Sequence, residues 1–104
     1  MPPYEGGGLG IADLVSPKRR EILAAVAKRR CTNPRVFGSV ARGEGRTTSD
    51  IDLMVTLLPN GSLLDIAELQ VELQALLGRT IDVVPDDALK WYAEPEIKAQ
   101  AVPI

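Results

Sequence analysis

The stretch VFGSVARGEGRTTSDIDLMV, residues 36–55, decides the fold of this chain. It runs from a short apolar segment through a Gly-Ser pair and a polar segment into a second apolar run that carries Asp50 and Asp52. Side chains alternate between the two faces of a β-strand. The alternation over residues 50–57 therefore predicts a strand with both aspartates and Met54 on an exposed face, and with the neighbouring aliphatic residues on a core face.

Signals for helices and strands alternate along the rest of the chain. Ser16-Pro17 is typical of a helix start, and Asn33-Pro34 is expected to end that helix. Residues 62–77 predict an amphipathic helix with a start that resembles a capping box. The remaining expected elements are a strand over 35–37, a brief helix over 38–42, a strand over 80–84, a helical turn from residue 86 and a last helix from residue 94 with Ile97, Ala101 and Val102 on its inner face. This order predicts an α/β (α+β) fold, in which a small mixed β-sheet is flanked by helices.

The size and composition of the chain suit a single domain. It has 104 residues, of which 45 % are hydrophobic, enough to build one core. Residues 1–14 are rich in Pro and Gly and are expected to form a flexible arm, with the domain over residues 15–104. No apolar run approaches the roughly 20 residues that span a bilayer, and the N-terminus lacks a secretory signal pattern. The single cysteine, Cys31, fits a reducing compartment, so a cytoplasmic location is expected.

Charge and the lack of histidine restrict the possible chemistry. The formal net charge of −2 gives no overall basic footprint, so direct binding of nucleic acid is not expected. Because the sequence contains no histidine, Ser-His catalysis, Cys-His catalysis and His-ligated zinc are excluded. Any metal must be held by oxygen atoms, which favours hard cations such as Mg²⁺.

A third carboxylate follows on a later predicted strand. In the TIDVV segment, Ile81 and Val83 are expected to point inward and Asp82 to the opposite face. If this strand pairs beside the one that carries Asp50 and Asp52, three carboxylates share one face. A divalent cation would relieve their repulsion, and two such ions clamp the oxygens of a phosphoryl displacement in two-metal sites. A solvated strand edge without metal is the alternative reading of an isolated Asp-x-Asp.

The Gly38-Ser39 pair lies between a predicted strand and a short predicted helix. Glycine lets the backbone approach a ligand closely, and free N–H groups at a helix start favour phosphate. The Ser39 hydroxyl adds a donor, and Arg42 follows one turn later, where it could reach a phosphate or brace the loop. The alternative is an ordinary strand-to-helix turn in which Ser39 caps the helix.

These features together resemble the signature of the DNA polymerase β-like nucleotidyltransferase superfamily. The signature combines Gly-Ser, ten intervening residues, Asp-x-Asp and a further aspartate on a later strand. The longer string GSVARGEGRTTSDIDLMV resembles the minimal nucleotidyltransferase (MNT) family, whose members are small bacterial and archaeal proteins often encoded beside a HEPN-domain protein. The resemblance extends from the first predicted helix, near residue 16, to the end of the chain.

The resemblance implies roles for six residues. Gly38 and Ser39 would hold the triphosphate of the nucleotide, and Arg42 would contact a phosphate or the loop. Asp50 and Asp52 would be ligands of two Mg²⁺ ions. Asp82 would be the third catalytic carboxylate, which binds the catalytic metal and helps to activate the acceptor hydroxyl.

The implied activity is protein adenylyltransfer. AMP would pass from ATP, the substrate, to a tyrosine of a HEPN ribonuclease toxin, so the protein would act as an antitoxin. A hetero-oligomer with this partner is the assembly that the resemblance implies. One alternative is an antitoxin that binds the toxin without catalysis, through the basic clusters at 18–20 and 28–30 and the aromatic pair Trp91-Tyr92. A small-molecule nucleotidyltransferase is the third reading, disfavoured because the sequence shows no acceptor-binding domain.

Overall fold

The computed structural model describes residues 8–46, 48–89 and 99–104. The elements in chain order are α1 (Ile11–Leu14), the 3₁₀ turn η1 (Ser16–Lys18), α2 (Arg19–Lys28), β1 (Cys31–Phe37), α3 (Gly38–Ala41), β2 (Ile51–Leu57), α4 (Leu63–Leu77), β3 (Ile81–Pro85), the 3₁₀ turn η2 (Asp86–Leu89) and β4 (Val102–Pro103). The four strands form one mixed sheet in the order β3-β2-β1-β4. β2 is parallel to β3, whereas β1 is antiparallel to both β2 and β4. This architecture confirms the expected small mixed sheet flanked by helices.

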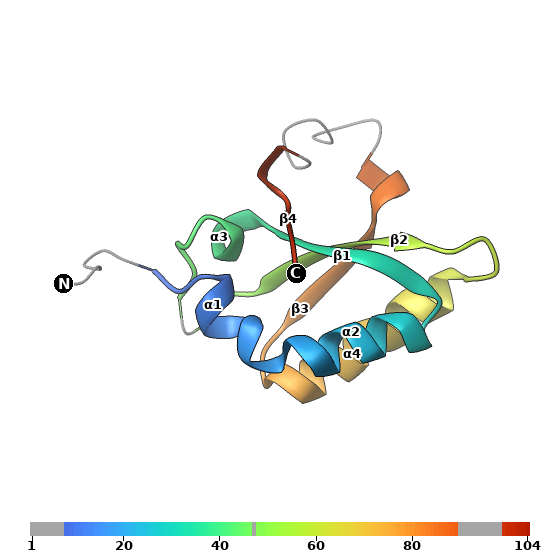
Figure 1. Ribbon diagram of the computed structural model, residues 1–104, viewed down its shortest axis with the longest axis horizontal. Helices are drawn as coiled ribbons and strands as arrows, with labels where there is room; N and C mark the ends of the chain where they lie inside the picture. Colours follow the sequence, from blue (N-terminus) through green and yellow to red (C-terminus); the bar gives the residue numbers. More distant parts are fainter. Residues whose placement is uncertain (1–7, 47, 90–98) are drawn as a thin grey trace.

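The core lies between the sheet and the pair of helices α2 and α4, which run side by side across one face (Figure 1). Alternate residues of β1, β2 and β3 point into this layer, as strand geometry requires. Most of the buried side chains that form the core come from both helices and from these three strands: Ile22, Ala25, Val26, Cys31, Val36, Ile51, Leu53, Val55, Ile66, Leu69, Leu73, Ile81 and Val83. Val15 and Val40 complete it.

Helix α4 agrees with its prediction and also protects an edge of the sheet. The Ser62 N–H donates to the Asp65 carboxylate (3.0 Å) at its start, and Gly78 ends it in the left-handed region. The side chains of Gln70 and Gln74 accept hydrogen bonds from the N–H groups of Val83 (3.0 Å) and Ile81 (3.3 Å). Since β3 is an outer strand, these glutamines occupy donors that would otherwise be open to another strand.

The first long helix ends earlier than predicted. The helix begins with a 3₁₀ turn at Ser16 and stops at Lys28, and the chain enters β1 at Cys31, before the Asn33-Pro34 pair that was expected to terminate the helix. Arg30 has a φ of 57°, which ends the helical path. Asn33-Pro34 lies inside β1, where the register with β2 shifts, and such an irregularity accepts a proline because no ladder N–H is needed.

Both ends of the chain depart from the expected boundaries. Residues 8–14 were assigned to a flexible arm, but Ile11–Leu14 forms α1 and packs against the core. Leu9 also exchanges two backbone hydrogen bonds with Gly45 (2.6 and 2.8 Å), which ties this segment to the polar loop. Residues 1–7 lie outside the described residues.

The prediction of a last helix is wrong at the C-terminal end of that helix. Val102 was assigned to its inner face, but Val102 pairs with Val36 as part of β4. Pro103 explains this, because the residue before a proline is pushed toward extended conformations. The start of that helix, with Ile97, and the pair Trp91-Tyr92 fall outside the described residues. None of the helices in the described ranges is both long enough and apolar enough to cross a membrane.

Candidate active site

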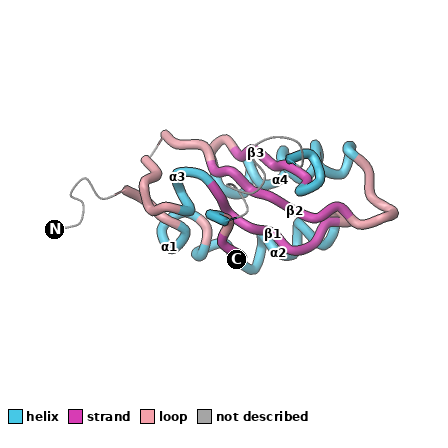
Figure 2. The backbone as a smooth tube through the Cα atoms, turned by 90° about the horizontal axis from the view of Figure 1, so that it is seen from above, coloured by secondary structure: helices cyan, strands magenta, loops and turns pink. Residues whose placement is uncertain are grey.

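Asp52 and Asp82 lie side by side on neighbouring parallel strands. The register of β2 and β3 pairs Asp52 with Asp82 and Ile51 with Ile81. Ile51 and Ile81 are 2 % and 1 % exposed on the helical side of the sheet, whereas Asp82 is exposed on the opposite side. The alternation predicted from the sequence is therefore present in both strands. This register places two carboxylates at the same level on one face of the sheet. Figure 2 shows the sheet from above, with β1 beside β2 and β3.

Asp50 stands at the entrance to β2, one residue before the strand begins. Its side chain is exposed, and no hydrogen bond or ion pair reaches it from the described part of the chain. The three predicted carboxylates thus gather at one end of β2 and β3, with Asp50 and Asp82 open to solvent and Asp52 half-buried.

The prediction that this whole face is exposed is wrong at Met54, which is buried. Met54 follows Asp52 on the same face and is 0 % exposed. Arg35 is its register partner in β1, and η2 packs on β2 at this end of the face. The aspartate face is therefore open at the carboxylates and covered farther along the strand.

Gly38 lies directly against the Asp52 carboxylate. Phe37, the last residue of β1, pairs with Asp52, so the Gly-Ser turn begins beside β2. Gly38 has a φ of 76°, and a Cβ built there would collide with Oδ2 of Asp52. Glycine is therefore favoured at this position by its left-handed backbone, and any larger residue would displace the Asp52 carboxylate from its place beside the turn.

The surroundings of Asp52 change the pKa of its carboxyl group. Its pKa is raised from the ordinary value of 3.8, first by burial, then by the negative charges of Asp82 and Asp50, while Arg42 acts in the opposite direction. Both raising effects disfavour the ionised form. A cation bound between these groups would reverse the balance, since an opposite charge favours the ionised form.

Ser39 and Arg42 flank the carboxylates in different ways. Ser39 is half-buried in the short helix α3, and its carbonyl accepts a hydrogen bond from the Glu44 N–H (2.8 Å). The Arg42 guanidinium donates to Glu44 Oε1 (3.0 Å) and to Gln100 Oε1 (3.1 Å). Arg42 therefore braces the loop and the C-terminal segment in this state, one of the two roles expected for it.

The donor set suits a hard divalent cation, but the protein does not form a closed cage for one. Carboxylate oxygens are the ligands that Mg²⁺ prefers. Within residues 8–46, 48–89 and 99–104, no three carboxylate or thiol groups converge closely enough to hold an ion by themselves. The arrangement matches the usual form of a Mg²⁺ site, in which one or two carboxylates are completed by substrate phosphates and water.

Two polar clusters near the site were missed in the sequence. Arg79, just before β3, donates to the carbonyls of Arg46 and Ser49 in the loop that precedes Asp50. Arg35, on the covered part of the face, donates to Thr56 (2.9 Å) and to Asp86 (3.2 Å). No local motif marks either arginine, because both act on segments distant in the sequence.

Comparison with known proteins gives a family match over most of the chain. Residues 19–103 match the nucleotidyltransferase domain family. A protein of Methanocaldococcus jannaschii, named as a candidate protein adenylyltransferase, is 34 % identical over 86 residues, which cover 83 % of this chain and 92 % of the relative. The protein adenylyltransferase MntA of Thermococcus cleftensis is 46 % identical over 55 residues, covering 53 % of this chain and 56 % of that protein.

Solved structures share the fold. A structure described as a candidate minimal nucleotidyltransferase aligns with a TM-score of 0.77 and 38 % identity, over 85 % of this chain and 90 % of the other. A toxin–antitoxin structure, MntA–HpeT, aligns with a TM-score of 0.62 over 83 % of this chain and 70 % of the other. Its identity is 20 %, so this second likeness concerns the fold alone.

Proposed function

The chain belongs to the nucleotidyltransferase domain family, and from this premise we propose that it transfers AMP from ATP to a hydroxyl group of a partner protein. The observation that carries the proposal is the register of Asp52 with Asp82, with Asp50 just before β2 and Gly38 against Asp52. This arrangement joins a carboxylate cluster to a turn that a phosphate can approach closely. A nucleotidyltransferase needs both features beside each other, because it must hold a triphosphate and the cation that accompanies it.

Asp50, Asp52 and Asp82 are the residues that would hold Mg²⁺ in this site, with two ions expected. When bound, Mg²⁺ supplies charge neutralisation at the phosphates and lowers the pKa of the acceptor hydroxyl. The raised pKa of Asp52 supports this assignment, because burial and then the charges of Asp82 and Asp50 disfavour its ionised form, and a bound cation would favour that form. Because Gly38 has no side chain, its backbone lies directly against the Asp52 carboxylate, so a phosphate that shares a cation with Asp52 would lie beside this turn, where the Ser39 hydroxyl adds a donor.

Asp82 is exposed to an incoming acceptor on the outer strand of the sheet. Asp52, by contrast, is half-buried between β1 and β3. We assign to Asp82 the orientation of the acceptor hydroxyl and the acceptance of its proton. Arg42 would exchange its contacts with Glu44 and Gln100 for a phosphate of the bound nucleotide.

The proposed partner is a toxin, and the proposed role is that of an antitoxin. The relative from Thermococcus is named a protein adenylyltransferase, and structural neighbours at low identity come from toxin–antitoxin complexes, one of them solved with AMP-PNP. The family resemblance of the GSVARGEGRTTSDIDLMV string adds a HEPN-domain ribonuclease as the toxin and one of its tyrosines as the acceptor. A cytoplasmic complex of the two proteins follows from these assignments.

The test combines the protein with ATP labelled in its α-phosphate, Mg²⁺ and the proposed HEPN-domain partner. Label should move to the HEPN protein, and Asp50→Ala should abolish this transfer. Replacing the acceptor tyrosine by phenylalanine should also stop labelling, which would identify the acceptor. If wild type transfers no label, or if Asp50→Ala transfers as much as wild type, the proposed activity is wrong.

Neutralisation by contact alone is a second candidate, favoured by apolar side chains on the outer face of α4. Leu63, Leu64 and Val71 are 72 %, 65 % and 65 % exposed, and a groove beside Val71 lies between α2 and α4. Exposed apolar side chains in a group are typical of a protein interface. Toxin neutralisation that survives Asp52→Ala but not Val71→Glu would support this second function.

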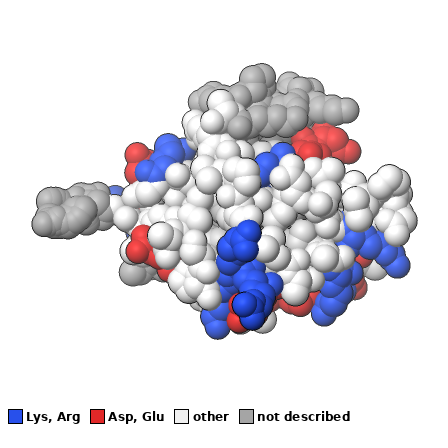
Figure 3. Space-filling model, in the orientation of Figure 1, with Lys and Arg blue, Asp and Glu red and all other residues white. Residues whose placement is uncertain are grey.

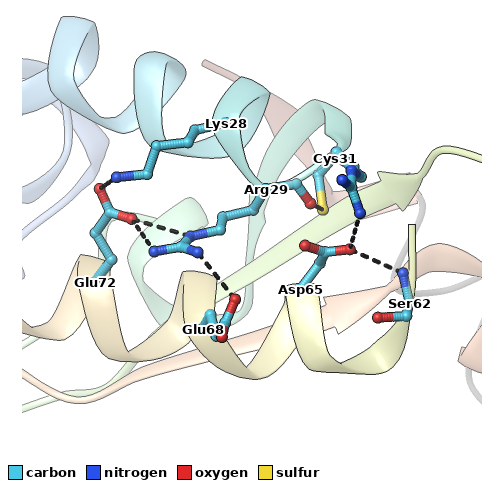
Figure 4. Close-up of polar contacts among 8 residues, drawn as sticks. Lys28, Arg29, Cys31, Ser62, Asp65, Glu68 and Glu72 are labelled. Atoms are coloured by element: carbon cyan, nitrogen blue, oxygen red, sulfur yellow. Dashed lines mark hydrogen bonds and ion pairs between the residues drawn. The ribbon is translucent and has the colours of Figure 1, made fainter. Parts of the chain in front are cut away.

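The basic cluster 28–30 supports binding less than its sequence suggested. Lys28 pairs with Glu72, Arg29 with Glu68 and Glu72, and Arg30 with Asp65, as Figure 4 displays. Basic and acidic side chains accordingly lie close together over the helical layer in Figure 3. These cations join α2 to α4 and are already matched by acidic neighbours.

A further inference from the structure

Arg79 holds the loop that leads into Asp50. Its Nη1 donates hydrogen bonds to the carbonyl oxygens of Ser49 (3.0 Å) and Arg46 (3.2 Å). From this geometry we infer that Arg79 is a positioning residue, which fixes the backbone at Asp50 and so the spacing of the carboxylates. The inference rests on the proposed function, because it concerns the residues that would hold the cation.

Arg46 and Ser49, the two residues that Arg79 contacts, are also joined to each other. The Ser49 N–H donates to the Arg46 carbonyl (3.0 Å), and the Arg46 N–H donates to the Ser49 hydroxyl (2.7 Å). Arg79 binds the same Arg46 carbonyl and also the carbonyl of Ser49. One guanidinium therefore anchors the turn as a unit to the start of β3.

The residue after Asp50 is held by the neighbour of Arg79. The Ile51 N–H donates to the Thr80 carbonyl (3.0 Å), which begins the pairing of β2 with β3. Asp50 is thus fixed from both sides, through Ser49 and through Ile51, by two consecutive residues. Its own side chain has no partner in the described part of the chain, so among these residues only the backbone limits the positions that the carboxylate can reach.

The anchor also belongs to the strand that carries the third carboxylate. Asp82 follows Arg79 by three residues and is in register with Asp52. A shift of the 46–49 turn would therefore move Asp50 relative to both other carboxylates. Loss of a group that orients a metal ligand typically lowers metal affinity about 10- to 100-fold.

Arg46 offers a matched control on the same loop. Its carbonyl accepts from Arg79, but its exposed side chain makes no hydrogen bond or ion pair with the described residues. Arg46→Met removes one positive charge near the site and keeps the carbonyl. Arg79→Met removes the same charge together with the two hydrogen bonds, so the two variants separate positioning from charge.

The first measurement is amide hydrogen exchange of the ligand-free protein. Arg79→Met should speed exchange at Ser49 and Ile51 about tenfold or more relative to wild type, while amides in the core of α4 stay unchanged. Arg46→Met should match wild type. Unchanged exchange at both amides in Arg79→Met would overturn the anchoring role, whatever the activity of the protein.

The second measurement is Mn²⁺ binding in the presence of a non-hydrolysable ATP analogue, followed by electron paramagnetic resonance. Arg79→Met should weaken Mn²⁺ binding about tenfold, Arg79→Lys should recover part of the loss because an ammonium can also donate twice, and Arg46→Met should bind as wild type. Equal Mn²⁺ binding by wild type and Arg79→Met would contradict the positioning role of Arg79 but not the proposed function. If wild type binds no Mn²⁺ with the analogue, the proposed function fails and the site that Arg79 positions does not exist. Should Arg79→Met not fold, Arg79→Gln provides the same comparison.

Discussion

The Asp52 carboxylate lies against Gly38 at the point where any other residue would place its Cβ. This contact joins the turn after β1 to the carboxylates of β2 and β3, two parts of the site that are separated by the α3 helix and the polar loop in the sequence. The proximity of a phosphate-accessible backbone and a half-buried carboxylate is the geometric basis of the proposed nucleotidyl transfer.

Gly38→Ala should abolish activity and destabilise the protein. The new Cβ would displace the Asp52 carboxylate, and the left-handed backbone at φ 76° adds about 1–2 kcal/mol of strain. Thermal unfolding and transfer of α-phosphate label measure the two effects. Gly78→Ala is the matched control, since Gly78 has a φ of 68° with no atom within 4 Å of an added Cβ. It should lose a similar stability and keep activity; equal activity in both variants would contradict the account.

Asp52→Asn should change how stability depends on pH. In wild type, burial and the charges of Asp82 and Asp50 hold the pKa of Asp52 above its ordinary value of 3.8. Between 3.8 and that higher pKa the folded state binds more protons than the unfolded state, so the free energy of unfolding falls as pH rises. Asp52→Asn should remove this fall and be more stable than wild type at neutral pH.

Urea unfolding from about pH 3 to pH 7 measures this difference. Below 3.8 the two proteins should converge, because Asp52 is then protonated in both states of wild type. Asp87→Asn, at an exposed position in η2, controls for the loss of one carboxylate elsewhere. Parallel curves for wild type and Asp52→Asn would show that the three carboxylates do not interact.

Mg²⁺ together with an ATP analogue should stabilise wild type and leave Asp52→Asn unaffected. A ligand present at 100 times its dissociation constant adds about 2.7 kcal/mol to the free energy of unfolding. Chelation of the metal should return the melting temperature to that of the apo protein. Stabilisation of equal size in Asp52→Asn would indicate that the cation binds elsewhere.

Arg35→Met should destabilise the covered end of the sheet. Arg35 donates to Thr56 and Asp86, and Thr56 donates to Asp86 (2.7 Å), so three segments meet in one network. Hydrogen bonds to charged groups contribute about 1.5–3 kcal/mol, and a loss in this range is expected in urea unfolding. A double-mutant cycle with Thr56→Val should give a coupling of at least about 0.5 kcal/mol. Additive effects of the two changes would mean that the network does not act as a unit.

The alternation of side chains along a strand made it possible to predict which face of the sheet carries the three carboxylates. A spacing of two places Asp50 and Asp52 on one face, and the buried neighbours of Asp82 place it on the same side of the sheet. The sequence did not reveal how far that face is open, because the burial of Met54 arises in the folded chain, where β1 pairs with β2 and η2 packs on it from distant segments.

Backbone conformations and long side chains were the features that sequence patterns missed. The helix end at Lys28 depends on the positive φ of Arg30, a residue type that rarely adopts it. Arg79 contacts backbone carbonyl oxygens, which every residue possesses, so no sequence motif indicates its partners. Such contacts follow from the approach of β2 and β3, which only the folded chain defines.

Transfer from ATP labelled either in the α-phosphate or in the γ-phosphate tests the central claim most directly. With Mg²⁺ and the proposed HEPN-domain partner, the account predicts that only α-label becomes attached to the acceptor, because nucleotidyl transfer releases the β- and γ-phosphates as pyrophosphate. Asp52→Asn should reduce this labelling by at least roughly 100-fold, since loss of even an outer-shell partner costs 10- to 100-fold. Attachment of γ-label, or α-labelling that Asp52→Asn leaves unchanged, would contradict nucleotidyl transfer at the Asp52–Asp82 site.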